Sequence, residues 1–178
     1  MSKEFELSDV IEIISEKLEN GGTVTFTPNG TSMLPMLRDG EDVVVLKKPT
    51  GRLHLFDVPL YRRPSDGHFV LHRVINFQRD GSYILCGDNQ FHKERGIYDK
   101  DIIGVMTSFT RKGKSYTPET LRYRIYINFW YYTRPFRHIY RFSSTKAKRF
   151  LGIEDKPKKD KTEPEAPDNK EIPDNNQK

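Results

Sequence analysis

The chain has 178 residues and a formal net charge of +5, and 35% of its residues are hydrophobic. This length and composition suit one globular domain with a core of its own. No run of 18 apolar residues occurs, so a transmembrane helix is not expected. The acidic, amphipathic N-terminus does not resemble a signal peptide. A single cysteine, Cys86, excludes an intramolecular disulfide and is consistent with a reducing compartment.

The excess positive charge is confined to one segment. Residues 1–119 hold 16 Lys and Arg against 17 Asp and Glu, whereas residues 120–153 hold eight Lys and Arg and no acidic residue. Residues 154–178 hold six Lys, eight acidic residues and no aromatic residue, and they are rich in proline. This composition predicts a disordered tail over 154–178. The basic segment, 118–153, therefore needs an explanation separate from that of the domain before it.

The predicted elements begin with a helix within residues 1–22, where Ser8 can cap an apolar stripe and Gly21 suits the C-terminal stop. Residues 23–117 then show short β-branched and aromatic runs separated by turns. The predicted strands are TVTFT, DVVVLKK, DVPLYRR, HFVLHRVINF, SYILCG and DIIGVMTSFTR. HRVINFQRDGSYILCG predicts a hairpin with Asp80 and Gly81 at its tip. The fold class expected is mostly β, a compact antiparallel sheet or barrel.

Ser32 lies in the turn GTSMLP and raises the question of a nucleophile. A serine hydroxyl needs a base, a group that orients the base, and donors for the oxyanion. Alone, such a serine is more often a capping or turn residue. His72, in FVLHRVI, is the candidate base because the unperturbed pKa of histidine is about 6.5. Asp88 and Glu94 are candidates to orient it, although a turn residue and a surface ion pair are their plainer interpretations.

Four ordered motifs change this balance: S-M-x-P, H-R-V-I, G-D-N, and an acid before Arg-Gly, followed by IIGVM. Over about residues 23–110 this order resembles the type I signal peptidase superfamily, which includes the self-cleaving SOS-response repressors. Bacterial signal peptidases carry lysine where this chain has His72. The histidine is similar to that of the endoplasmic-reticulum, archaeal and sporulating-bacterial branch.

The resemblance implies the β catalytic core of that superfamily and a serine endopeptidase that cleaves leader or signal-like peptides after small residues. Ser32 would be the nucleophile and His72 the general base, with Asp88 and Glu94 at the acidic positions. Activity would fall as the pH decreases through about 6 to 7, because the base must be neutral and a nearby carboxylate raises its pKa. A catalytically inactive binding module and a self-cleaving regulator are the alternatives. The regulator is disfavoured because too few residues precede Ser32 for a DNA-binding domain.

The chain departs from the superfamily pattern in three ways. Glu94 replaces the usual aspartate, the membrane-spanning anchor is absent, and Gly30 stands where a serine often helps to bind the oxyanion. The oxyanion hole would then depend on the N–H of Ser32, alone or together with Thr31. The residues expected to line the oxyanion and substrate site are Gly30, Thr31, Met33 and Pro35. No cofactor is expected, and no metal, because the histidines lack metal-ligand spacing.

Residues 121–142 predict a basic, aromatic, amphipathic helix that Pro135 kinks or splits. The apolar face comprises Leu121, Ile125, Phe129, Tyr132, Phe136 and Ile139, and the opposite face carries Arg134, Arg137 and Arg141. This pattern favours an anionic membrane surface as partner, with packing on the β-domain as the main alternative. Single-stranded nucleic acid is less favoured because no nucleic-acid motif accompanies the helix. The expected location is the cytoplasmic side of the cell membrane, as a peripheral protein.

Overall fold

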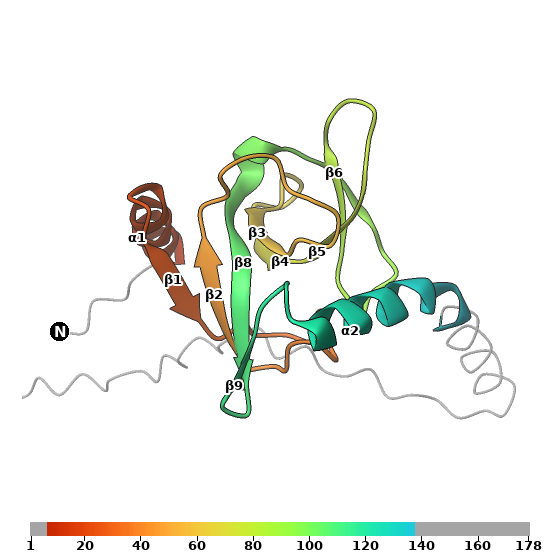
Figure 1. Cartoon of the computed structure of the whole chain (residues 1–178). Coiled ribbons are helices and arrows are strands. Elements are labelled where there is room, and N and C mark those ends of the chain that lie inside the picture. The colour runs from red at the N-terminus through yellow and green to blue at the C-terminus, as the bar shows by residue number, and fades with distance from the viewer. Residues whose placement is uncertain (1–6, 138–178) are drawn as a thin grey trace, which may run out of the picture. The chain divides into compact units, whose positions relative to one another are not determined.

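The computed structural model describes residues 7–137 of the chain. The predicted N-terminal helix is α1, Leu7–Glu19 (Figure 1). It ends at Glu19, and Gly21 follows with a φ of +75°, in the left-handed region that glycine tolerates best. Buried Leu18 packs α1 against strand β8 (Ile102–Arg111), where a Cβ on Gly104 would lie 2.9 Å from Leu18 Cδ1.

The larger sheet has the strand order β1-β2-β8-β3-β4, with β9 paired to β8, and all its pairs are antiparallel. Its strands are β1 (Thr23–Phe26), β2 (Val43–Lys47), β3 (Pro59–Arg62), β4 (Phe69–Leu71), β8 (Ile102–Arg111) and β9 (Lys114–Tyr116). The long strand β8 runs through its middle (Figure 1). The mostly β, antiparallel fold class is therefore confirmed.

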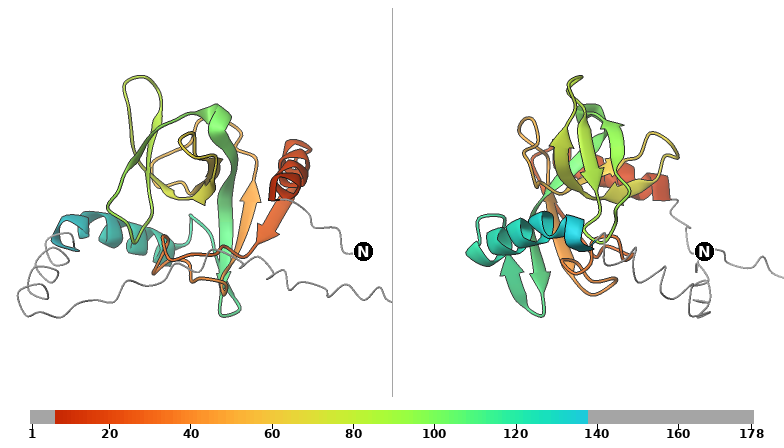
Figure 2. Two further views of the ribbon diagram at one scale, coloured as in Figure 1. Left: turned by 180° about the vertical axis from the view of Figure 1, so that it is seen from behind. Right: turned by 90° about the vertical axis from the view of Figure 1, so that its right-hand side faces the viewer.

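The smaller sheet has the order β5-β6-β7, with bounds Arg73–Phe77, Tyr83–Cys86 and Glu94–Ile97. The predicted hairpin is confirmed, because β5 and β6 pair in antiparallel register from Arg73 opposite Cys86 to Phe77 opposite Tyr83. Both sheets are open in the described part of the chain, so the barrel alternative is not realised. Figure 2 shows the small sheet above helix α2 (Leu121–Tyr132) from two further sides.

Two strand predictions need correction. The run HFVLHRVINF is not one strand: β4 ends at Leu71 in the larger sheet and β5 begins at Arg73 in the smaller one, so His72 lies at the change of sheet. The Glu94-Arg95-Gly96 stretch, which lies outside the predicted strands, forms β7 and pairs with β6. In both cases the hydrogen-bonding partner decides the outcome, and that partner is remote in sequence.

Helix α2, Leu121–Tyr132, follows β9 closely and packs on the β-domain. Its inner side buries Tyr123 and Ile127 in the same cluster as Phe109 of β8. The helix predicted over 121–142, which Pro135 was expected to kink or split, is interrupted at Thr133, before a further helical stretch at 134–137. The predictions for Ile139, Arg141 and the tail 154–178 lie outside the described residues. Within the described part, no helix has the length and apolarity needed to cross a bilayer.

Candidate active site

Ser32 lies in a turn closed by the hydrogen bond from Leu34 N to Thr31 O, 3.3 Å long, and a second turn follows in which Leu37 N donates to Met33 O at 2.9 Å. Gly30 leads into this turn with a φ of +100°, a conformation that strains any residue with a Cβ. The backbone geometry therefore explains why glycine occupies the position at which the superfamily often has a serine. The N–H of Gly30 donates to Asp39 Oδ1 at 2.7 Å, so that group is already engaged. The Ser32 side chain is half-buried.

The Gly87-Asp88-Asn89 loop holds the Ser32 turn from the side. Asn89 N donates to Ser32 O at 2.8 Å, and Asn89 Nδ2 donates to Thr31 O at 3.1 Å. A Cβ on Gly87 would lie 2.7 Å from Ser32 O, a distance that backbone atoms do not tolerate. Glycine is required there because the two backbones meet. The G-D-N motif thus positions the serine through its first and third residues.

His72 is 2% exposed and sits against two oxygen-bearing side chains. Its Nδ1 lies 3.2 Å from Glu94 Oε1 and 3.3 Å from the hydroxyl oxygen of Tyr61. The Tyr61 hydroxyl donates its only proton to Glu94 Oε2, so its oxygen acts as an acceptor toward Nδ1. Both contacts therefore assign the proton of a neutral His72 to Nδ1. Nε2 is then the nitrogen that can accept a proton from a nucleophile.

Glu94 is held in place by a forked contact from Arg63. Arg63 Nη2 lies 2.9 Å from Glu94 Oε1 and Arg63 Nε lies 3.1 Å from Oε2, while Nη1 pairs with Asp66 at 2.7 Å. Burial by itself would raise the pKa of Glu94. Hydrogen bonds from His72, Arg63 and Tyr61 outweigh burial and lower that pKa to about 2. Glu94 therefore stays ionised beside His72 at any physiological pH.

The lowered pKa of Glu94 predicts an acid-sensitive contribution to stability. Because the folded pKa is about 2 against an ordinary 4.5, the contribution is fully present above pH 4.5 and is lost as the pH falls toward 2. It amounts to at most about 3 kcal/mol. Urea unfolding of wild type and Glu94→Gln across this range should show a shallower acid decline in the variant. Glu16→Gln, at an exposed position on α1, is the control, and equal slopes would contradict the prediction.

The sequence made Asp88 a candidate to orient His72, but in the structure Asp88 pairs with Arg73. It forms a buried, two-pronged ion pair with Arg73, with Nε–Oδ1 and Nη2–Oδ2 distances of 2.7 Å each. Helix α2 adds two more contacts, from the Tyr126 hydroxyl to Asp88 Oδ2 at 3.0 Å and from Trp130 Nε1 to Asp88 O at 2.8 Å. Burial and the Asp88 charge raise the pKa of Tyr126, so its hydroxyl remains a donor. Asp88 thus joins α2 to the Ser32 loop, and the carboxylate beside His72 is Glu94.

Ser32 and His72 line one pocket with a volume of about 210 Å³. No direct hydrogen bond joins these two side chains, both of which the structure describes. Gly30 and Met33 line the same pocket, whereas Thr31 and Pro35 do not. Pro35 instead borders an apolar depression beside Phe109, and Thr31 contributes its carbonyl to the loop contact with Asn89. Within residues 7–137, no group of three or more His, Cys, Asp or Glu side chains is arranged to hold a metal ion.

Three residues of this site were missed from sequence: Tyr61, Arg63 and Gln90. Tyr61 and Arg63 stand two residues apart at the end of a predicted strand, a spacing that places side chains on one face. That spacing was the available signal for the pair that holds Glu94. Gln90, which borders the pocket, had no comparable signal in its turn-rich surroundings. Comparison of the chain with protein-family models, with characterised proteins and with solved structures gave no significant match.

Proposed function

We propose that the protein is a serine endopeptidase in which Ser32 is the nucleophile, His72 the general base and Glu94 the residue that orients the base. One observation carries this proposal: the pocket shared by Ser32 and His72, in which Glu94 and Tyr61 hold Nδ1 and leave Nε2 to accept a proton. A buried histidine with an ionised carboxylate at Nδ1 and a half-buried serine near it is the arrangement that nucleophilic catalysis requires.

The proposed reaction has two stages. Ser32 Oγ attacks the scissile carbonyl carbon while its proton passes to His72 Nε2, and His72 then protonates the departing amine. The resulting ester on Ser32 is attacked by a water whose proton His72 accepts, and that proton returns to Ser32 when the acid product leaves. In this mechanism Ser32 and His72 move into hydrogen-bond contact when substrate binds. Catalytic hydrogen bonds are often long in free enzymes and shorten in the complex with substrate.

An extended peptide suits the edge of the larger sheet beside this pocket. Strand β4 is the last strand in its order, so within the described residues one of its edges is unpaired. Its residues 69–71 form part of the pocket wall and lead directly to His72. A substrate added as a further strand would place its scissile bond at Ser32. Cleavage after a small residue is the specificity that we propose for this site.

The oxyanion hole of the proposed enzyme uses the Ser32 N–H and a second donor. The N–H of Gly30 is engaged by Asp39, and the side chain of Thr31 does not reach the pocket wall. Gln90 does line the pocket, and a glutamine amide can donate to a developing oxyanion. We assign the second donor to Gln90 for this reason.

The cytoplasmic side of the cell membrane remains the location we propose for this activity, with a leader-bearing or membrane-proximal precursor as substrate. A peripheral association there would bring the pocket to substrates held at the same surface. Fractionation of cells, combined with protease protection of spheroplasts, measures both the membrane association and the side on which the protein lies. Full degradation in intact spheroplasts would place the protein outside and overturn this location.

The proposed function is tested by labelling the purified chain with a fluorophosphonate and by screening a library of extended peptides. We expect one labelled serine, identified as Ser32 by mass spectrometry, and cleavage after small residues. Ser32→Ala should lose both signals, whereas Ser115→Ala, at an exposed serine of β9, should keep them. Absence of label and of cleavage in the wild type would favour a binding module that uses the same pocket. Shortening of the chain itself in a Ser32-dependent manner would favour a self-cleaving regulator.

A further inference from the structure

An apolar stripe runs along the outer side of helix α2 and into the helical stretch at 134–137, and the rest of the described chain leaves it uncovered. Its members, which we call the outer stripe, are 60% to 73% exposed: Leu121, Ile125, Phe129, Tyr132 and Phe136. Nine large hydrophobic residues are exposed in the described part of the chain, and five of them are on this one face. Single exposed apolar residues are ordinary, but a contiguous row of this kind marks an interaction surface.

The inner side of the same helix already has its partners, so the outer stripe is not a misplaced core. Tyr123 and Ile127 are buried against the domain, and Tyr126 and Trp130 hold Asp88. The helix is therefore apolar on two sides, and only one of them packs on the domain. Packing on the β-domain, the main alternative considered from sequence, accounts for the inner side alone.

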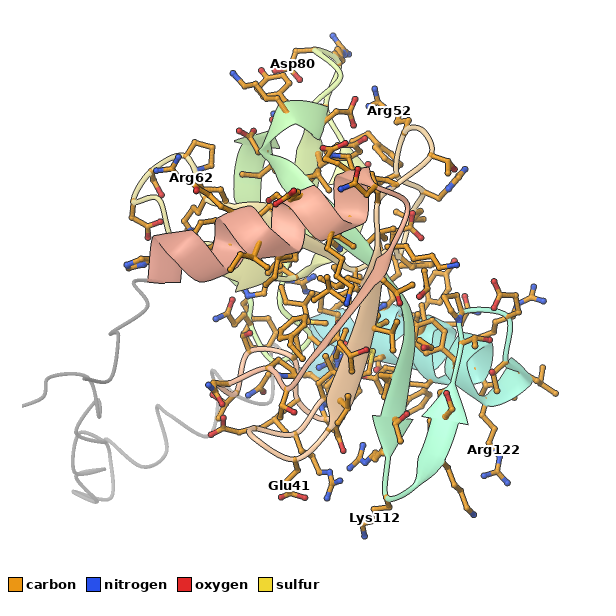
Figure 3. All side chains as sticks on the ribbon, turned by 90° about the vertical axis from the view of Figure 1, so that its left-hand side faces the viewer. Glu41, Arg52, Arg62, Asp80, Lys112 and Arg122 are labelled. Carbon is orange, nitrogen blue, oxygen red and sulfur yellow. The ribbon has the colours of Figure 1, made fainter. Side chains whose placement is uncertain are left out.

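Cations border the outer stripe. Arg122 and Arg124 are exposed on α2 itself, and Arg122 points away from the body of the domain (Figure 3). At the other end of the helix, a pocket of about 600 Å³ is lined by Lys93, Arg95 and Arg134 together with Tyr132 of the stripe. No carboxylate lines this pocket. The face as a whole therefore combines exposed apolar side chains with sites for anions.

The arginines exposed beside the outer stripe are not Arg134 and Arg137, which the sequence placed on the basic face of the helix. Arg137 stacks on the Trp130 ring, 3.5 Å from its centroid, and donates to the Trp130 carbonyl. Arg134 donates to Cys86 Sγ at 2.7 Å and so reaches the pocket only with part of its guanidinium. Both arginines lie on the packed side of the helix. The free cationic surface is provided instead by Arg122, Arg124, Lys93 and Arg95.

We propose that the outer stripe and the cationic pocket dock the protein on an anionic lipid bilayer. Leu121, Ile125 and Phe129 would enter the headgroup region, where an amphipathic surface helix lies parallel to the membrane plane. Tyr132 suits headgroup depth because its ring is apolar and its hydroxyl polar. Lys93 and Arg95 would meet lipid phosphates or carboxylates beside it. This inference does not depend on the proposed peptidase activity.

Other occupants fit this face less well. Single-stranded nucleic acid stacks its bases on aromatic rings, whereas the stripe begins with aliphatic Leu121 and Ile125. A second copy of the chain, packed across a two-fold axis, would cover the apolar row but would offer no acidic partner from the stripe to Arg122 and Arg124. A bilayer containing anionic lipid satisfies the apolar row and the cations at once.

Co-sedimentation of the full chain with vesicles tests this proposal. We expect binding to phosphatidylcholine vesicles that contain phosphatidylserine, and little binding to phosphatidylcholine alone. Phe129→Glu should weaken the binding at least about tenfold, because it removes apolar contact and adds a repelled charge. The double substitution of Lys93 and Arg95 by alanine should cost about fivefold per cation. Ile13→Glu, at an exposed apolar position of α1, is the matched control and should bind as the wild type does.

Several results would overturn the proposal. They are failure of the wild type to sediment with anionic vesicles, and unchanged binding by Phe129→Glu in a protein whose thermal unfolding matches the wild type. A dimer in sedimentation velocity that Phe129→Glu dissociates would assign the face to a second copy. Competition by a single-stranded oligonucleotide that depends on Phe129 would assign it to nucleic acid. Fluorophosphonate labelling of Ser32, measured in the same variants, keeps this outcome separate from that of the proposed peptidase.

Discussion

Replacing His72 by alanine is expected to lower kcat/KM for the best peptide substrate by about 10⁴- to 10⁶-fold. Without the imidazole, the proton of Ser32 has no acceptor in the pocket, and the leaving amine has no donor. The measurement is steady-state hydrolysis, supported by the rate at which a fluorophosphonate labels Ser32. Loss of less than tenfold in a folded His72→Ala variant would remove His72 from the mechanism.

The contribution of Glu94 can be separated from that of His72. Glu94→Gln keeps the side-chain length but removes the charge that stabilises a protonated His72, and a loss of about 10²- to 10⁴-fold is expected. Asp66→Asn is the matched control, because Asp66 contacts Arg63, as Glu94 does, but forms no ion pair with His72. Since the pKa of Glu94 is lowered to about 2, a fall in rate near pH 6 could not come from protonation of Glu94. That fall, expected for a histidine base, remains a prediction.

Removing the Asp88 carboxylate is expected to produce the largest loss of stability, about 3–5 kcal/mol for Asp88→Ala. Arg73 is 4% exposed and would keep its charge with only the Phe56 carbonyl and the Tyr123 hydroxyl as oxygen partners. The Tyr126 hydroxyl would lose its acceptor as well. Such a loss is a large part of the 5–15 kcal/mol that holds a typical domain folded. Urea unfolding followed by tryptophan fluorescence measures it, since Trp130 contacts Asp88.

Two further variants keep this prediction decisive if Asp88→Ala does not fold. Asp88→Asn retains an acceptor for Arg73 and should be less destabilised than the alanine variant. The double variant Arg73→Met with Asp88→Leu should be more stable than Asp88→Ala, because it leaves no unpaired buried charge. A cost below about 1 kcal/mol for Asp88→Ala would mean that the pair is solvated rather than buried. In that case α2 would not be anchored through Asp88.

The strands that sequence predicted correctly are those with a local signal. The runs around Val43–Lys47 and Ile102–Arg111 alternate buried and less buried residues, and their β-branched content favours extended backbone. The hairpin at Asp80 and Gly81 follows from turn chemistry that acts over a few residues. The change of sheet at His72 had no such signal. Whether Leu71 and Arg73 share a sheet depends on which distant strands they pair with.

The candidate site divides in the same way. Residue type and order pointed to Ser32, His72 and two possible carboxylates, because nucleophile, base and acid have few chemical alternatives. The choice between Asp88 and Glu94 lay beyond sequence. Each carboxylate forms an ion pair with an arginine: Asp88 with Arg73, and Glu94 with Arg63. Only the folded chain shows which of these two pairs lies beside His72.

Helix α2 shows where local pattern ends and tertiary structure decides. The apolar stripe of residues 121–136 follows from helical periodicity, which requires nothing beyond the spacing of side chains. The exposure of the stripe does not follow from periodicity, because periodicity identifies an apolar face but not the surface, if any, that covers it. The inner side of α2 packs on the domain because it finds partners there. Trp130 donates a hydrogen bond to Asp88, and Tyr123 and Ile127 pack in the apolar core beside β8. These long-range contacts leave Leu121, Ile125 and Phe129 facing outward.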